Sequence, residues 1–385
     1  MASGSSTDPS ESDRGPIARV RARLEGPNTV GNSRGFWVGF AVAVLALVAY
    51  PVVGNGEQFS LFLVLALLGL SLSVVWGYSG VLSFGQVVFF GVGGYTFGVV
   101  SINLPDATGI TGAVVVGVAF GALVAALMGY FMFYGGVRDV YVTIITLVAT
   151  MVMHTFMAQT AGSEWTIGEA ALGGFNGMPA IPLLALGVEG VFSYQFVFNE
   201  FELFVPGFGV VEFDPFYYLA LALLVTTYLG LRALVNSDYG RVMVAVREDQ
   251  DRTQMFGYDV KRVKLLTFTL GGGLAALSGV LYAARNVYID PQVFALWFAT
   301  LPVIWVSVGG RKSLLGAVVA TIGIEYFRLS IEGELALVVL GGLLLVFILA
   351  LPGGIVPWTS DRLAGSAVPV SEIDDSDAPA EVTDS

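Results

Sequence analysis

The sequence of 385 residues contains no cysteine and a single histidine, His154. Without cysteine the chain forms no disulfide, no thiolate metal site and no cysteine nucleophile. One histidine excludes a histidine-based zinc site built within the chain. Charged residues are also scarce, at 12% of the chain, which is about half the fraction that soluble domains carry. Thiol-dependent proteins, histidine-based zinc proteins and ordinary soluble proteins are therefore disfavoured from the start.

Apolar residues make up 55% of the chain, and its mean hydropathy is +0.78. A chain this apolar needs lipid as its solvent, and a helix needs about 20 mostly apolar residues to cross a bilayer. We therefore predict an all-α polytopic membrane protein with about ten transmembrane helices, some of them short or broken. The predicted spans are Phe36–Val53, Phe59–Trp76, Ser83–Ile102, Gly112–Phe133, Val140–Met157, Phe216–Leu234, Leu265–Ala284, Phe298–Val308, Leu314–Phe327 and Leu335–Leu351.

The distribution of basic residues predicts the orientation. With the N-terminus in the cytoplasm and alternating spans, 16 of the 18 lysines and arginines fall on the cytoplasmic side, as the positive-inside rule requires. The segment 159–214 has no lysine or arginine and six glutamates. It is expected outside as a small cap with short β-like runs such as Val191–Phe198. Both chain ends are then cytoplasmic.

The two ends of the chain are polar. The segment 1–34 has five arginines and lacks the early apolar stretch of a cleaved signal peptide, so it is expected to be a retained cytoplasmic segment. The segment 358–385 is acidic and has no sustained apolar pattern, which predicts a disordered cytoplasmic tail. The membrane domain is expected over 35–357.

A cytoplasmic loop over 235–264 has the pattern of short amphipathic helices. Its apolar residues are Val242, Val246, Met255 and Phe256, and Gly257 is expected to break the helix. A short helix with an apolar face and a charged rim is suited to docking in a groove of another protein. The alternative is a solvated basic loop that only sets the topology.

Three motifs give the chain a resemblance to the permeases of branched-chain amino acid ABC transporters. The loop resembles their pattern G-R-x-x-x-A-x-R-E-x-x-x-A-x-x-x-x-G. Two further matches are Gly77–Tyr95 and Ile304–Ala317, and the resemblance covers Phe59–Pro357. In the loop, Arg252 stands where alanine is common. The matching loop residues are Gly240, Arg241, Ala245, Arg247, Glu248 and Gly257.

The resemblance implies a non-enzymatic permease subunit of an ATP-driven importer in the cell membrane, surrounded by lipid. It would pair with a homologous second permease, and two cytoplasmic ATPases would dock on Arg241–Lys264 and its counterpart. An external solute-binding protein would deliver the substrate. The chain itself would bind no cofactor, since ATP and magnesium would be used by the ATPases. Outside one short loop, the basic residues form no positive face, so no nucleic-acid partner is expected.

The finer resemblance is to the LivM-like subunit of the urea branch of this family. It rests on Trp76–Gly80, on Asp251–Thr253 followed by Phe256–Tyr258, and on the aromatic stretch Val303–Arg311. We therefore expect urea or a short amide as the substrate, with a branched-chain amino acid as the first alternative. A second alternative is an ion-coupled secondary transporter, which would need ion-coordinating residues at the midplane of the bilayer.

Polar residues at membrane depth are candidates for the translocation path. Ser83, Gln86 and Tyr95 lie in or near one glycine-rich span. Thr143, Thr146 and Thr150 share one helix face in another. Unsatisfied polar atoms are costly in lipid, so these groups line a pore or bond to neighbouring helices. The glycines of the first span are expected to permit close helix packing, and Glu325 is expected to pair with Arg328.

Overall fold

The computed structural model describes residues 24–29, 31, 33–52, 54, 56–196, 201–205, 209–329 and 341–342. In this part of the chain, seven helical segments are long and apolar enough to cross a membrane. They are α2 (Arg34–Ala49) with the turn η2 (Tyr50–Val52), α3 (Gly56–Leu72) with the π-helical η3 (Ser73–Tyr78), α4 (Gln86–Asn103), α5 (Ala107–Tyr134), α6 (Asp139–Ala158), α7 (Pro215–Val235) and α10 (Val260–Asn286).

Two shorter helices, α11 (Leu296–Gly309) and α12 (Leu314–Leu329), follow the turn η6 (Pro291–Phe294). They correspond to the two predicted short spans. The tenth predicted span, Leu335–Leu351, lies outside the described residues except for 341–342. The structure thus confirms a polytopic helical protein, whereas the predicted count of about ten spans is not confirmed.

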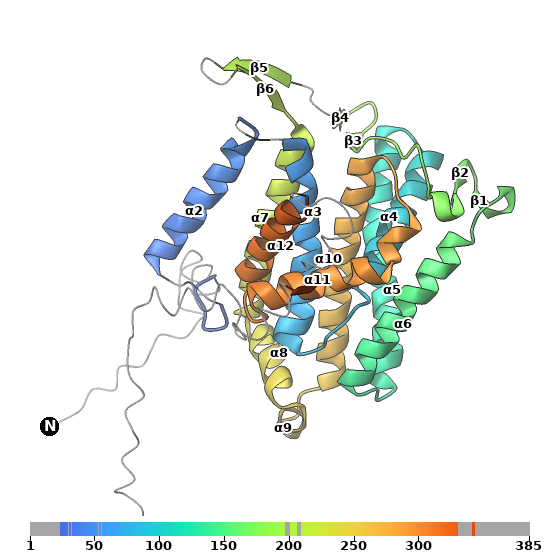
Figure 1. The fold of residues 1–385 in the computed structure, drawn as a ribbon. Coiled ribbons are helices and arrows are strands. Elements are labelled where there is room, and N and C mark those ends of the chain that lie inside the picture. The colour runs from blue at the N-terminus through green and yellow to red at the C-terminus, as the bar shows by residue number, and fades with distance from the viewer. Residues whose placement is uncertain are drawn as a thin grey trace, which may run out of the picture.

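The helices α3, α4 and α10 form the centre of the bundle, and α5 packs against α4 and α10 with its other face exposed. The helix α2 stands at the edge, where none of its residues is buried (Figure 1). Small residues let the central helices approach closely. A Cβ atom on Gly93 of α4 would lie 2.6 Å from the carbonyl oxygen of Ala276 on α10. Close contact between backbones is the usual basis of helix association in lipid. The predicted packing role of the glycines is therefore confirmed for this pair of helices.

The connection between α3 and α4 is not helical over 80–85. The π-helical turn η3 ends there, and Gly80 takes a φ of +80°, a conformation that glycine adopts without the Cβ clash of other residues. The predicted span Ser83–Ile102 is therefore wrong at its start, because α4 begins only at Gln86. Ser83 belongs to an irregular segment instead.

Three antiparallel β-hairpins correct the all-α prediction. They pair β1 (Thr166–Ile167) with β2 (Ala170–Ala171), β3 (Ala185–Val188) with β4 (Phe192–Gln195), and β5 (Phe201–Val205) with β6 (Gly209–Phe213). The hairpins lie between α6 and α7, and β4 falls in the predicted β-like run. Backbone groups outside the helices need hydrogen-bond partners, and local strand pairing supplies them.

The bundle has two chemically different ends. The short helices α8 (Asp238–Glu248) and α9 (Gln250–Met255) lie at the end opposite the hairpins β3–β4 and β5–β6 (Figure 1). At the hairpin end, the buried Arg285 pairs with Asp214 at 3.2 Å and Glu57 at 3.5 Å. The cytoplasmic assignment of the α8–α9 end stays a prediction from charge. The segments 1–23 and 358–385 lie outside the described residues.

Candidate functional site

Helix α8 forms because its first turn is capped and one face is apolar. Ser237 Oγ accepts a hydrogen bond from the amide of Gly240 at 3.3 Å, which satisfies a free donor at the helix start. Met243 and Val246 are fully buried. The expected amphipathic helix is present, with Met243 rather than Val242 as the second fully buried residue.

Helix α9 ends in exposed apolar side chains. Asp249 caps it by accepting a hydrogen bond from the amide of Arg252 at 2.9 Å. The helix ends at Met255, and Gly257 follows with a φ of +87°, so the predicted break at Gly257 is observed. Met255 is 86% exposed and Phe256 is 76% exposed. These two side chains form an apolar tip that the described part of the chain leaves open to solvent.

Arg247 anchors α8 to the bundle. Its Nη1 donates a hydrogen bond to the carbonyl oxygen of Gly77 at 2.5 Å, and its side chain is only 12% exposed. Gly77 lies in η3, near the helix end where carbonyls lack intrahelical partners. A cation there also complements the helix dipole. Arg247 therefore caps the end of α3 from a different helix.

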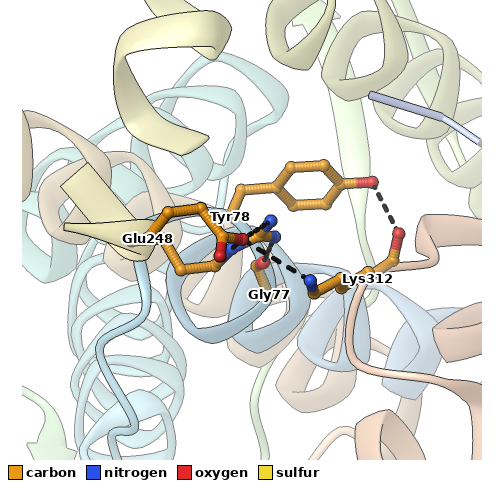
Figure 2. A network of polar contacts seen from close by, with 5 residues as sticks. Gly77, Tyr78, Glu248 and Lys312 are labelled. Atoms are coloured by element: carbon orange, nitrogen blue, oxygen red, sulfur yellow. Dashed lines mark hydrogen bonds and ion pairs between the residues drawn. The ribbon is translucent and has the colours of Figure 1, made fainter. Parts of the chain in front are cut away.

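Glu248 and Lys312 extend this contact to a third segment (Figure 2). Glu248 Oε1 accepts hydrogen bonds from Arg247 Nε at 3.0 Å and Nη2 at 2.6 Å, and it lies 3.5 Å from Lys312 Nζ. The hydrogen bonds from Arg247 lower the pKa of Glu248. Tyr78 donates a hydrogen bond to the carbonyl oxygen of Lys312 at 3.2 Å. The turn between α11 and α12 is thereby joined to both α3 and α8.

Asp139 makes a second set of contacts at the start of α6. It pairs with Lys264 of α10 at 2.6 Å and accepts a hydrogen bond from Gln250 of α9 at 2.5 Å. Lys264 is almost fully buried, so this contact is shielded from water and less screened than a surface pair. The α8–α9 element is thus bonded to α3, α6 and the α11–α12 turn. The last residues of the predicted loop 235–264 are helical, because Asp259 caps α10 and Val260 begins it.

The seven predicted loop residues divide into two groups. Gly240 is buried, and Arg247 is held against Gly77. The other five are exposed: Arg241, Ala245, Glu248, Arg252 and Gly257. Among them, Glu248 also contacts Arg247 and Lys312. The structure thus separates an inner anchor from an outer surface within one short element.

The threonine stripe of α6 supports the irregular segment 80–85. Thr143 Oγ1 donates to the carbonyl oxygen of Leu82 at 3.0 Å, and Thr146 Oγ1 accepts from the amide of Phe84 at 3.2 Å. Thr150 Oγ1 donates to the carbonyl oxygen of Phe84 at 3.3 Å. Non-helical backbone at membrane depth requires such partners. The hydroxyl groups of Thr143 and Thr146 are therefore used in support of the backbone.

A valine at position 146 tests this support. Valine keeps the shape of the side chain but leaves the amide of Phe84 without its partner, so we expect Thr146→Val to cost about 1–2 kcal/mol. Thermal unfolding of the detergent-purified protein measures the loss. The matched control is Thr155→Val on the same helix, because the exposed Thr155 bonds within its own helix, to the carbonyl of Met151. Equal stability of the two variants would contradict the supporting role.

The remaining path candidates differ in how their polar atoms are used. Ser83 Oγ accepts from the amide of Gly85 at 3.0 Å, which serves the turn before α4. Gln86 Oε1 accepts from Ser71 at 3.3 Å, whereas its Nε2 has no partner among the described residues. The hydroxyl of Tyr95 is buried, likewise has no partner in the described part of the chain, and its ring stacks on Phe294. Gln86 and Tyr95 remain candidates for the path.

Sequence reasoning missed Asp139 and Gln250, which are far apart in the chain and meet only in the fold. It also missed the role of Gly77, whose Cβ would lie 2.0 Å from the carbonyl oxygen of Arg311. The many glycines in the sequence around Gly77 were the signal from which this close backbone approach could have been predicted. Among the described residues, no group of three or more His, Cys, Asp or Glu side chains could hold a metal ion.

Together the helices and these contacts define a multi-pass membrane protein with a short helical element bonded to the end of its bundle. Residues 57–351 match the family described as branched-chain amino acid transport system / permease component. The chain belongs to this family of transport permeases.

Curated relatives agree with this membership. The high-affinity branched-chain amino acid transport system permease protein LivM of Escherichia coli strain K12 is 29% identical, over 84% of this chain and 76% of the relative. LivM of Salmonella typhimurium is 28% identical over the same shares of both chains. BraD of Pseudomonas aeruginosa, a permease of the same kind of system, is 26% identical over 73% of this chain and 79% of its own length. No solved structure matches the chain.

Proposed function

We propose that this chain is the membrane-spanning permease subunit of an ATP-driven importer for branched-chain amino acids. The observation that carries the proposal is the match of the permease family over 57–351 together with the anchored α8–α9 element. The LivM and BraD relatives are named for branched-chain amino acid transport. Family membership favours this reading over an ion-coupled secondary transporter.

The proposed importer has several other subunits. A homologous second permease completes the translocation path, two cytoplasmic ATPases bind and hydrolyse ATP with magnesium, and an external binding protein delivers the substrate. This chain binds no cofactor and performs no covalent chemistry. Its α8–α9 end and both termini face the cytoplasm, and the segment 159–214 faces outward.

The α8–α9 element is the proposed coupling element. The exposed tip of Met255 and Phe256 offers an apolar anchor, and the exposed Arg241 and Arg252 supply a charged rim for a groove on an ATPase. When the ATPases close on ATP, they move this element. Arg247 passes the motion to the end of α3.

Urea or a short amide is the second candidate substrate, because the aromatic stretch Val303–Arg311 resembles the urea branch. Trp305 of this stretch is fully buried, and a Cβ on Gly69 of α3 would lie 3.7 Å from its ring. The ring therefore packs in the helix core, which accounts for the aromatic residue without a substrate. The aromatic stretch therefore gives no separate support to urea, and the names of the LivM and BraD relatives favour the branched-chain amino acid.

Uptake by cells tests the proposal. We expect cells that lack the gene to lose uptake of labelled leucine and keep uptake of labelled urea, and the restored gene to recover leucine uptake. Loss of urea uptake alone would contradict the proposed substrate and return the assignment to the urea branch.

A further inference from the structure

A cavity with both apolar and charged walls lies at the hairpin end of the bundle. Its volume is about 440 Å³, and it is lined by α3, α10, η6, α11, α12 and Asp290 just before η6. Sites for small molecules have volumes of roughly 300–1,000 Å³. Leu61 and Leu65 of α3, with Val293 and Trp297, supply apolar walls, and charged side chains come from α12 and the loop.

The charged wall contains an ion pair that is only partly satisfied. Glu325 is fully buried, and its Oε2 accepts hydrogen bonds from both Nε and Nη2 of Arg328, at 2.9 Å and 2.7 Å. Glu325 Oε1 has no hydrogen-bond partner among the described residues. That oxygen is buried away from the cavity, so the carboxylate holds the guanidinium group of Arg328 in place. The Arg328 side chain, which is 31% exposed, is the charged group of this pair that a molecule in the cavity can reach.

Asp290 adds a second carboxylate to the same cavity. It lies in the loop between α10 and α11, where its Oδ1 accepts a hydrogen bond from the amide of Gln292 at 3.1 Å. The cavity thus places the guanidinium group of Arg328 and the carboxylate of Asp290 next to an apolar wall.

We infer that this cavity binds the transported amino acid as a zwitterion within the permease itself. The inference rests on the proposed function. The substrate carboxylate binds the guanidinium group of Arg328, which Glu325 positions, and the substrate ammonium group binds Asp290. The aliphatic side chain lies against Leu61 and Leu65. A neutral solute such as urea would leave these charged groups without charged partners, so the cavity discriminates against it.

Direct binding to the assembled transporter tests the inference. The probe is labelled leucine, and the sample is this chain in nanodiscs with its second permease and ATPases, without the binding protein. We expect saturable leucine binding. Isoamylamine, which lacks the carboxylate, and isocaproate, which lacks the ammonium group, should each compete at least about tenfold more weakly than leucine, because each loses one charge-assisted contact. Urea should not compete.

Variants identify the residues. Arg328→Gln and Glu325→Gln should each weaken leucine binding about tenfold to a hundredfold. Arg328→Lys keeps the cation and should recover part of the binding. The matched control is Arg138→Gln, which removes the same charge from an exposed position at the other end of the bundle. A purely structural ion pair would change the stability of the variants without changing the ranking of the three competitors.

The outcomes separate the inference from the proposed function. If the complete importer transports leucine, but the complex shows no saturable binding or both single-charge analogues compete as well as leucine, the inference is wrong and the proposed function stands. Wild-type affinity in Arg328→Gln would overturn it in the same way. If the complete importer transports no leucine, the proposed function fails and the inference fails with it.

Discussion

Arg247→Ala is expected to reduce leucine transport at least about tenfold while the chain still inserts and assembles with its partners. The substitution removes the hydrogen bond to the carbonyl of Gly77, and bonds of this charge-assisted kind contribute about 1.5–3 kcal/mol. The other contacts of α8, including the buried Met243 and Val246, remain. The ATPases therefore still dock, but their motion is no longer passed to α3.

Transport and ATP hydrolysis measured together in reconstituted complexes distinguish this uncoupling from a loss of assembly. We expect hydrolysis to continue in Arg247→Ala while transport falls, and Arg247→Lys to recover part of the transport. Arg138→Ala is the matched control, since Arg138 is exposed at the same end of the bundle. Wild-type transport by Arg247→Ala, at equal amounts of complex, would remove the proposed role of Arg247.

Gly279→Ala is expected to prevent the central helices from packing. A Cβ at this position of α10 would lie 1.8 Å from the carbonyl oxygen of Phe90 on α4. Backbone atoms on both sides cannot rotate away, so α4 and α10 must separate. The expected cost is about 3 kcal/mol, at the upper end of overpacking effects. The yield of monodisperse protein in detergent and its thermal unfolding temperature should both fall.

Gly273→Ala is the control for this substitution because Gly273 lies on the same helix. A Cβ there would lie 3.5 Å from the Cβ of Ala122, which is an ordinary van der Waals distance. We expect this variant to keep the yield and unfolding temperature of the unchanged protein. If the two alanine variants were equally stable, the close approach of α4 and α10 would not be what holds the centre of the bundle together.

The membrane helices were predictable because lipid imposes a simple length and hydropathy rule. The span predicted as Gly112–Phe133 lies within α5, and that predicted as Val140–Met157 lies within α6. The start of α4 was predicted too early for a local reason. Gly80 and the π-helical turn break the helix inside an apolar stretch, and hydropathy does not detect such a break.

The candidate site was predictable only in part. The pattern around Arg247 indicated a functional loop, because a basic amphipathic segment stands out between apolar spans. Its anchor on Gly77 was not predictable, because the partner is a backbone carbonyl 170 residues away. Thr143 and Thr146 share a helix face as predicted. Their role in supporting residues 82–84 became visible only when the fold brought that irregular segment against α6.

Transport by the purified importer tests the central claim most directly. This chain, its second permease, the two ATPases and the binding protein are placed in liposomes, and accumulation of labelled leucine and labelled urea is followed with and without ATP. We predict leucine accumulation that requires ATP and the binding protein, with no accumulation of urea. Leucine accumulation driven by an ion gradient without ATP, or ATP-driven accumulation of urea alone, would contradict the account.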